Sequence, residues 1–476
     1  MKIAELSNPV MSGWLREQGL RLDASPYVSG ALKMKKLLER LPDTVPLASL
    51  TAGHDGGIFN GPMFRRVYLN DPEHSVPFLG TKDMMAADLT SLPRLCKSDA
   101  VSARLSYLEL KPGMTLISCS GFNAGRRAYV RPDMGGIWSS QDTLKVEPDP
   151  KKIKSGYLYA FLLSRFGEAL VRGSVYGSAV KHIEPRHISG LPVPRLEERV
   201  ETEIHDLVEK SAQLRANHQA ELVDATKDFF ESNGLPELID LRWHRERREH
   251  DLGFEVPGVG STSLRALNFA PRAQQLIGKL RSAPGKTLER ICTGGTLRTG
   301  ARFKRIDSDS EHGIRLIGQR QSFWLRPEGR WINEAQAPDD IRLKDETVLI
   351  AARGTLGENE VYGRSVFITG SWLAHAYSQD YVRVVSGDPE VSGAYLFAFF
   401  RSEAAFRALR SFSVGGKQQE YHPRFLRELH IPIAPPDART RIANKVRSAY
   451  KHRDEADVLE DKALALLTTA VEEAAS

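Results

Sequence analysis

Apolar and polar positions follow the same pattern twice along this chain. Residues 157–194 begin with apolar side chains at spacings of three and four, typical of an amphipathic helix, and continue into a glycine-containing loop and a short strand that ends in proline. Residues 395–432 repeat the pattern 238 residues later, half of the chain length of 476. Eleven of the 38 aligned positions are identical, whereas average composition gives roughly two or three. The identical pairs are Tyr157/Tyr395, Leu158/Leu396, Ala160/Ala398, Phe161/Phe399, Ser164/Ser402, Arg172/Arg410, Gly177/Gly415, Pro185/Pro423, Arg186/Arg424, Leu191/Leu429 and Pro194/Pro432.

Strand patterns precede each copy of the helix. The peptide LKPGMTLIS at 110–118 matches LKDETVLIA at 343–351, and each is typical of a turn followed by a β-strand. The dipeptide Gln-Asp at 141–142 and again at 379–380 precedes a second strand-like run. A repeated unit this large is a domain, because solenoid repeats are about 20–50 residues long. We therefore predict an α+β (mixed) fold with two similar globular domains.

A long helical pattern follows each of the two repeated units. Apolar residues recur at spacings near three and four from Val200 to Phe229, and again from Ile442 to Leu466, with charged residues between them. Such a narrow apolar stripe on a charged helix favours a coiled-coil seam, and the two helices can pair with each other. The alternative is two ordinary helices that each cap a globular core.

The predicted elements divide the chain into six parts. A connector between the two units contains a charged peptide, RWHRERREH, and a glycine-rich peptide, VPGVGSTS. The charged peptide is interpreted as a solvated cluster, with a phosphate-contacting patch as the alternative. In order, the parts are an N-terminal segment (1–45), a first globular domain (46–195), a central helix (196–232), the connector (233–285), a second globular domain (286–434) and a C-terminal helix (435–476).

Composition narrows the class of protein. Apolar residues make up 41% and charged residues 26% of the chain, which is ordinary for a soluble globular protein. No apolar run approaches the roughly 18 residues that span a bilayer, and the N-terminus lacks the apolar core of a signal peptide. The three cysteines are widely spaced and fit neither a disulfide framework nor a zinc site, so we predict a cytoplasmic protein without a metal. The formal net charge of +6 weakly favours a polyanionic partner.

Catalytic motifs are missing from the sequence. The peptide VPGVGSTS lacks the Gly-Lys-Ser/Thr ending of a phosphate-binding loop. NPVM at 8–11 begins like an amino-methyltransferase motif, but the aromatic residue that stacks on a flipped base does not follow. We therefore predict no catalytic residue and no cofactor in this chain. The alternative is a divergent stand-alone nuclease that uses acids such as Asp142 near Lys145, or Glu358 and Glu360.

The doubled layout resembles the specificity (S) subunits of Type I restriction–modification systems. The segments GSAVKHIEPRHISGLPVP and GGKQQEYHPRFLRELHIP carry this resemblance, each followed by a long charged helix, over almost the whole chain. The resemblance implies that each globular domain is a target-recognition domain that reads one half of a split DNA site. It further implies pseudo-two-fold symmetry between the domains, which two long antiparallel helices forming a coiled coil would separate.

The same resemblance implies the partners. The helices would dock two DNA adenine methyltransferase (M) subunits, and restriction (R) subunits could join the assembly for phage defence. S-adenosylmethionine, ATP and Mg²⁺ would belong to those partners, since an S subunit does no chemistry itself. Residues 1–45 and the long connector depart from the family pattern, which leaves open a relative in another defence or methylation system. A protein scaffold that does not read DNA is the remaining alternative.

Glycine-flanked basic or amide residues are the best candidates for contacts with double-stranded DNA. Loops carry such contacts, and glycine permits a close approach of the backbone. Because the two copies differ outside their shared pattern, we expect different half-sites and an asymmetric full site. Arg186/Arg424 recurs in both copies and is interpreted as structural. The predicted DNA-binding residues are Arg126, Arg127 and Lys181 in the first unit, and Arg302, Lys304, Arg305, Arg320, Gln321, Arg353, Lys417, Gln418 and Gln419 in the second.

Overall fold

The chain forms two compact units in the computed structural model, which describes residues 12–17, 25–102, 104–177, 181–243, 253–256 and 263–475. Unit 1 comprises residues 1–216 and 455–476, and unit 2 comprises residues 217–454. Most of the charged peptide and of the glycine-rich peptide of the predicted connector lies outside the described residues. Two helices, α8 (Glu198–Ser232) and α14 (Pro436–Ala474), run through the boundary between the units.

Unit 1 contains a four-stranded antiparallel sheet in the order β2-β8-β5-β6. A three-stranded sheet, β4-β3-β7, pairs β3 with β7 in parallel, and β1 pairs with β9. The strands are β1 (Thr44–Pro46), β2 (Ile58–Phe59), β3 (Ser75–Leu79), β4 (Arg94–Cys96), β5 (Thr115–Ser118), β6 (Arg127–Tyr129), β7 (Trp138–Ser139), β8 (Thr143–Val146) and β9 (Pro192–Pro194). The shorter helices are α1 (Ser12–Glu17), α2 (Ser25–Val28), α3 (Ala31–Leu38), α4 (Lys97–Ala100), α5 (Ser155–Leu163), α6 (Arg165–Ser174) and α7 (Pro185–Ile188).

Unit 2 repeats this topology. Its four-stranded sheet has the order β11-β17-β14-β15, its three-stranded sheet the order β13-β12-β16, and β10 pairs with β20. A small hairpin joins β18 to β19. The strands are β10 (Gly285–Thr287), β11 (Thr296–Thr299), β12 (Gly313–Ile317), β13 (Gly329–Asn333), β14 (Thr347–Ala351), β15 (Ser365–Ile368), β16 (Ala376–Tyr377), β17 (Tyr381–Val385), β18 (Ser413–Val414), β19 (Glu420–Tyr421) and β20 (His430–Pro432). The shorter helices are α9 (Pro271–Ser282), α10 (Leu288–Ile291), α11 (Gly393–Phe400), α12 (Glu403–Ser411) and α13 (Pro423–Arg427).

Individual bonds recur in the two units at matching positions. The Tyr157 hydroxyl donates to the carbonyl of Pro194 at 2.7 Å, and the Tyr395 hydroxyl donates to the carbonyl of Pro432 at 3.0 Å. Ser164 and Ser402 each accept a backbone N–H as the N-cap of α6 and α12. The predicted duplication of a mixed α+β domain is therefore confirmed down to single hydrogen bonds.

The glycine that is identical in the two copies, Gly177 and Gly415, has the same unusual backbone conformation in both. Gly177 has φ 95° and Gly415 has φ 97°, a backbone conformation that favours glycine. Each glycine precedes α7 or α13 in the chain, and proline occupies the first turn of both of these short helices. The repeated glycine-to-proline spacing in the sequence therefore reports a repeated turn and helix start.

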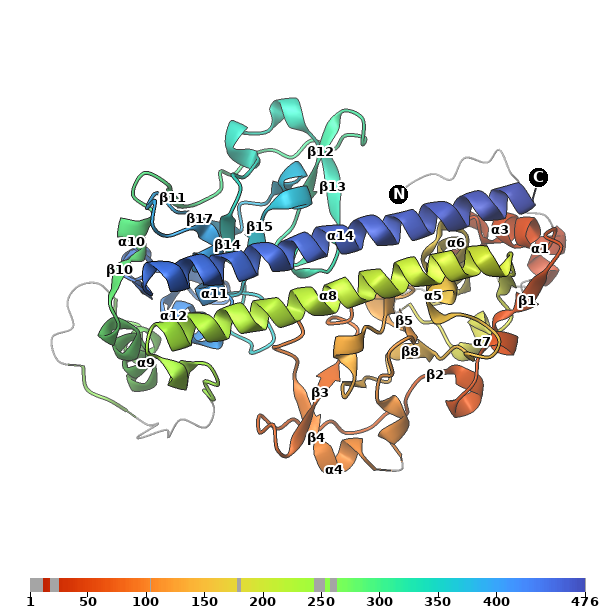
Figure 1. The fold of residues 1–476 in the computed structure, drawn as a ribbon, viewed down its shortest axis with the longest axis horizontal. Coiled ribbons are helices and arrows are strands. Elements are labelled where there is room, and N and C mark those ends of the chain that lie inside the picture. Colours follow the sequence, from red (N-terminus) through yellow and green to blue (C-terminus); the bar gives the residue numbers. More distant parts are fainter. Residues whose placement is uncertain are drawn as a thin grey trace. The chain divides into compact units, whose positions relative to one another are not determined.

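The helices α8 and α14 run side by side and antiparallel (Figure 1). Within unit 1, the Ser211 hydroxyl donates to the carbonyl of Ala456 at 2.8 Å. Within unit 2, the Ser448 hydroxyl donates to Glu221 at 3.1 Å. Further pairs give the direction within each unit. In unit 1, Glu203 pairs with Lys462 and residue 210 with residue 455; in unit 2, residue 221 pairs with residue 448 and Asp228 with Arg441. In each unit the residue number falls along α14 as it rises along α8, which confirms the predicted antiparallel pairing of the two long helices.

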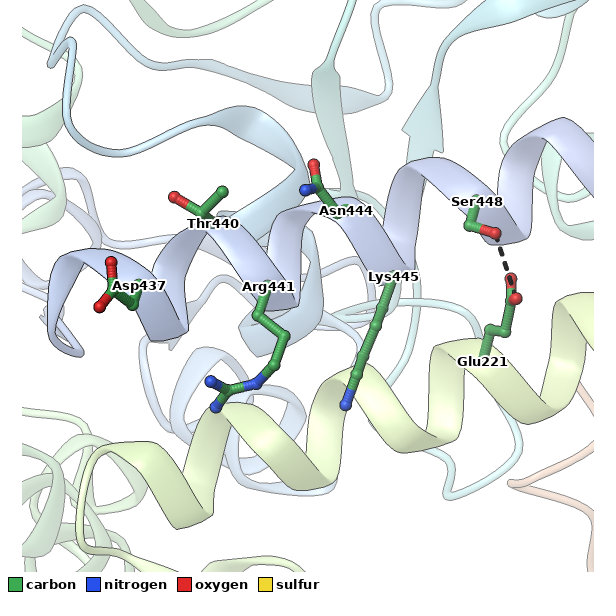
Figure 2. A pocket seen from close by; sticks show the side chains of 7 residues that line it. All are labelled: Glu221, Asp437, Thr440, Arg441, Asn444, Lys445 and Ser448. Atoms are coloured by element: carbon green, nitrogen blue, oxygen red, sulfur yellow. Dashed lines mark hydrogen bonds between the residues drawn. The ribbon is translucent and has the colours of Figure 1, made fainter.

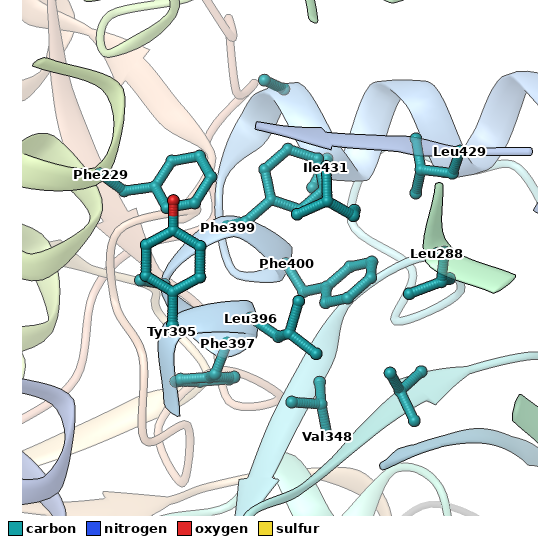
Figure 3. Packing of buried hydrophobic residues seen from close by; sticks show 14 of the residues in the cluster. Phe229, Leu288, Val348, Tyr395, Leu396, Phe397, Phe399, Phe400, Leu429 and Ile431 are labelled. Atoms are coloured by element: carbon teal, nitrogen blue, oxygen red, sulfur yellow. The ribbon is translucent and has the colours of Figure 1, made fainter. Parts of the chain in front are cut away.

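The apolar stripe of each helix also joins the core of the unit in which it lies. In unit 2, the Phe229 ring of α8 lies 5.0 Å from the ring of Tyr395 and 5.5 Å from that of Phe399 on α11 (Figure 3). In unit 1, Ile204 of α8 and Leu467 of α14 belong to one buried cluster with α5. The helices therefore both pair with each other and cover globular cores, so the two alternatives drawn from the sequence are combined.

Candidate nucleic-acid interface

Three loops of unit 2 meet at one end of its four-stranded sheet. Arg353 follows β14, and its backbone N–H donates to the side-chain oxygen of Gln319 in the loop after β12 at 3.2 Å. The Gln319 amide returns a bond to the Arg353 carbonyl at 2.6 Å. The backbone N–H of Gln419, in the hairpin loop, donates to the carbonyl of Gly354 at 2.8 Å. We call these three loops, residues 318–323, 352–357 and 414–420, the unit 2 loop cluster.

Six of the predicted DNA-binding residues belong to the unit 2 loop cluster. Arg320, Lys417 and Gln418 are exposed, and Gln321 is half-buried. The guanidinium of Arg353 pairs with Glu420. Gln419 is 4% exposed, and its amide donates to the carbonyl of Gly416, so its side chain holds the loop in shape rather than facing solvent.

The remaining three predicted residues of unit 2 lie in the segment that follows β11. Arg302 and Lys304 are exposed, and Arg305 is half-buried. The Arg305 guanidinium donates to the side-chain oxygen of Gln379 at 2.6 Å. The backbone carbonyl of Asp380, the next residue, accepts from the backbone N–H of Ala352 at 2.8 Å. This segment is thus attached to the same end of the sheet as the unit 2 loop cluster.

Unit 1 brings together two of the corresponding loops, residues 119–126 and the residues 176–177 with 181–182. The backbone N–H of Cys119 donates to the carbonyl of Asp142 at 2.8 Å, and that of Gly121 to the carbonyl of Lys181 at 3.1 Å. The Lys181 side chain is exposed, and that of Arg126 is half-buried. Arg126 and Lys181 therefore lie in adjoining loops, which we call the unit 1 loop cluster.

Arg127 has a different environment from its neighbour Arg126. It is 7% exposed, and its guanidinium donates to the carbonyl of Gly125 at 2.7 Å and pairs with Glu168 of α6. A guanidinium with these internal partners ties the sheet to α6. We therefore assign Arg127 to domain packing and leave it out of the proposed contact surface.

Sequence patterns alone did not single out Arg66. Its guanidinium donates to the side-chain oxygen of Gln141 at 2.8 Å and lies 3.4 Å from Asp142. This bond matches the one between Arg305 and Gln379 in unit 2. The repeated Gln-Asp dipeptide was the sequence signal for this arginine. Gln141 and Gln379 recur at matching positions, and each accepts a bond from an arginine.

Packing does not explain why an arginine recurs at the equivalent positions 186 and 424 of the two repeats. The Arg186 side chain is 75% exposed and pairs with Glu184, while that of Arg424 is 64% exposed and pairs with Glu428. Exposed ion pairs contribute little to stability. The exposure of both side chains therefore does not support the prediction that Arg186 and Arg424 have a structural role.

Buried cations occupy the middle of both four-stranded sheets. Lys145 on β8 is 1% exposed and donates to the carbonyl of Ser140 at 3.1 Å. Burial lowers the pKa of Lys145 to about 7, with Asp142 acting in the opposite direction. The residue at the matching position of β17, Arg383, is also buried, and burial lowers its pKa. Neither cation faces solvent, so neither is available to an external anion.

Two acids of the nuclease alternative, Asp142 and Glu358, are engaged by other groups. Asp142 accepts from Ser120 and from Arg66, and Glu358 forms a bidentate pair with Arg407. Among the described residues, Asp71, Glu73 and His74 form one group whose ligand atoms lie within 4.8 Å of one another. This group is largely exposed, and nothing else in its surroundings points to a cation.

A groove in unit 2 follows α14 along α8 (Figure 2). Its two basic residues, Arg441 and Lys445, reach toward α8 and pair with Asp228, whose pKa they hold well below its usual range. Thr440 and Asn444, which also line the groove, point from α14 away from α8 (Figure 2). Since its cations are already neutralised, this groove is not a basic site for DNA.

Comparisons with known proteins found several similar solved structures, three of which are described here. The S subunit of the Type I restriction–modification system from M. genitalium is 12% identical, with a TM-score of 0.36, over 89% of this chain and 95% of that one. The HsdS subunit from Thermoanaerobacter tengcongensis is 12% identical, with a TM-score of 0.27, over 91% and 97%. A chain from a study of complex assembly in the type I R-M system is 14% identical, with a TM-score of 0.27, over 90% and 98%.

No protein-family model and no curated protein sequence matches the chain. Within the described ranges, no helix combines the length and the apolar character needed to cross a membrane.

Proposed function

We propose that this chain is a non-catalytic specificity subunit of a Type I restriction–modification system, which directs methyltransferase subunits to a bipartite DNA sequence. The observation that carries the proposal is a duplicated domain whose fold is the same in both copies while the loops at one end of its sheet differ. A shared fold with unlike loops suits two unlike half-sites on one duplex, much as dimer symmetry suits matched half-sites.

The two loop clusters would supply the DNA contacts. Arg126 and Lys181 are the candidates in unit 1, and Arg320, Gln321 and Lys417 are among those in unit 2. Phosphate contacts by lysine and arginine would give most of the affinity, which then falls steeply with salt. Specificity would come from side chains at base edges, where arginine pairs with guanine and glutamine with adenine.

The long helices would set the distance between the half-sites and dock the partners. A continuous helix rises 1.5 Å per residue, so α8 and α14 can serve as rulers through the unit boundary. Two adenine methyltransferase subunits, and restriction subunits where the system has them, would bring S-adenosylmethionine, ATP and Mg²⁺. This chain would contribute recognition and no reaction step.

Purification with and without partners tests the proposal. The chain alone should bind duplex DNA with a strong dependence on salt and transfer no methyl group. Together with its methyltransferase subunit, it should direct adenine methylation to a split motif. Methylation by the chain alone, or DNA binding that is insensitive to salt, would contradict the proposal.

A further inference from the structure

A second local repeat lies in the peptide that leads out of the four-stranded sheet in each unit. In unit 1 it reads GPMFRRVY over residues 61–68, and in unit 2 it reads GARFKRID over residues 300–307. The two copies are 239 residues apart and share glycine, phenylalanine and the second arginine, with Arg65 matched by Lys304 and Val67 by Ile306. We call each copy the cross-sheet segment.

The two cross-sheet segments begin at equivalent places in the fold. Just before them, Ile58 pairs with Val146 in unit 1, and Leu297 pairs with Val384 in unit 2. Each segment therefore leaves the first strand of the four-stranded sheet at the same register.

The segments also end at equivalent places. Tyr68 bridges to Leu95 of the three-stranded sheet in unit 1, and Asp307 bridges to Ile332 of the three-stranded sheet in unit 2. In between, the second arginine of each copy, Arg66 or Arg305, donates to the repeated glutamine. The same backbone path is thus tied down by the same three attachments in both units.

Some side chains of the segments face inward and others face outward. Phe64 and Phe303 pack against small apolar clusters. Arg65 and Lys304 are both exposed, so each copy presents a cation at the same position. Two residues earlier the copies differ, because unit 1 presents Met63, which is 85% exposed, and unit 2 presents the exposed Arg302.

We propose that the cross-sheet segment is a DNA-contact element in both units, with separate roles for its constant and its variable position. Arg65 and Lys304 hold a phosphate, and Met63 and Arg302 read a base edge in the major groove. This inference rests on the proposed function of the chain, and it assigns to unit 1 a contact surface that sequence patterns did not mark there.

The division of roles follows from what DNA offers. Phosphates are the same in every half-site, so a phosphate contact can keep the same charge in both units. Base edges differ between half-sites, so a base-reading position must differ too. A methionine side chain suits the methyl group of thymine, and an arginine suits the two acceptors of guanine.

Exchange of the variable position tests base reading. The variants Met63→Arg and Arg302→Met, each assembled with the methyltransferase subunit, are scored by the sequence of the methylated sites. We expect Met63→Arg to introduce a guanine preference at one position of one half-site, and Arg302→Met to relax a guanine in the other half-site. The matched controls Arg172→Met and Arg427→Met alter arginines whose side chains are 68% and 57% exposed and which pair with glutamates outside the segments; the motif should not change.

Removal of the constant position tests phosphate binding. Arg65→Ala and Lys304→Ala should each weaken binding to all sequences alike, leave the motif unchanged, and lower the slope of log affinity against log salt by about 0.9. An unchanged slope in both variants overturns the phosphate role. Thermal unfolding midpoints equal to that of the wild type show that the variants fold.

The outcomes separate this inference from the function on which it rests. If the wild-type complex methylates no split motif, the proposed function fails and takes the inference with it. If the wild type methylates a split motif and the variants at 63 and 302 leave both half-sites unchanged, only the inference fails. Loss of methyltransferase binding in Arg65→Ala or Lys304→Ala, with DNA affinity unchanged, would show a protein contact instead and would also overturn it.

Discussion

Lys145 shows how burial alters the titration of a single side chain in this protein. Its folded-state pKa is lowered to about 7 because burial penalises the ammonium, while an unfolded lysine has a pKa of about 10.4. Between these two values the unfolded chain binds one proton more than the folded chain. The free energy of unfolding therefore rises with pH across this window.

The variant Lys145→Met removes this titration. We expect the free energy of unfolding of the wild type to rise relative to the variant by up to about 1.4 kcal/mol per pH unit between about pH 7 and pH 10. Urea unfolding at pH 7, 8 and 9 measures the difference. Lys210→Met is the control, since the Lys210 side chain is 62% exposed. Parallel pH profiles for wild type and Lys145→Met would show that the ammonium is not buried.

Single residues were the hardest part to predict from the sequence. Arginine and glutamine usually lie at the surface, which made Arg127 and Gln419 candidates for DNA contact. Their burial depends on Glu168 and on the carbonyl of Gly416, and only the first of these partners is distant in the sequence. Arg66 was missed for the same reason as the burial of Arg127, because its partner Gln141 lies 75 residues away.

The α8–α14 pair contains a buried ion cluster that specifies its register. Within unit 1, the Arg215 side chain is 5% exposed and donates to Glu460 at 2.8 Å and to Asp457 at 2.9 Å. The Tyr159 hydroxyl of α5 donates to Glu460 at 3.1 Å. A shift of one helix by a turn would leave these charges buried without partners, which is costly.

Truncation of Arg215 tests the role of this cluster. We expect Arg215→Ala to lower the free energy of unfolding by about 3–5 kcal/mol, because Glu460 keeps its buried charge. The exposed pair of Lys210 with Glu455 on the same helices gives the control, and Lys210→Ala should cost at most about 1 kcal/mol. Equal losses for the two variants, measured by chemical denaturation, would contradict a specifying role for the buried cluster.

Elements were easier to predict than single contacts. The apolar stripes of the two long helices and the glycines 177 and 415 are local signals, and each marks a helix or turn in the structure. The single amphipathic helix predicted at the start of each repeat is two helices instead, because Ser164 and Ser402 each cap a second helix, α6 or α12. The pairing partners of the strands were not predicted, because many strands are only two to five residues long and such short apolar runs do not specify their neighbours. The cross-sheet segments escaped notice because their register differs by one residue from the main repeat.

The continuity of both long helices through the unit boundary predicts how the chain responds to shortening. Removal of four residues from α8 between Ser211 and Glu221 breaks either the Ser211–Ala456 bond or the Glu221–Ser448 bond. We expect this single deletion to prevent assembly with the methyltransferase. A matching deletion of four residues from α14 between Ser448 and Ala456 should restore both bonds and shorten the DNA spacer by about two base pairs, since four helical residues rise about 6 Å. A restored complex with an unchanged spacer would remove the role of ruler.

Mapping of methylated adenines across the genome is the sharpest test of recognition by two separate units. Cells carrying the wild-type chain and its methyltransferase should show one split, asymmetric motif that disappears when the chain is deleted. Replacement of residues 46–195 by the corresponding domain of another such protein should change one half of that motif and leave the other half intact. A motif that changes in both halves, or in neither, would contradict the account.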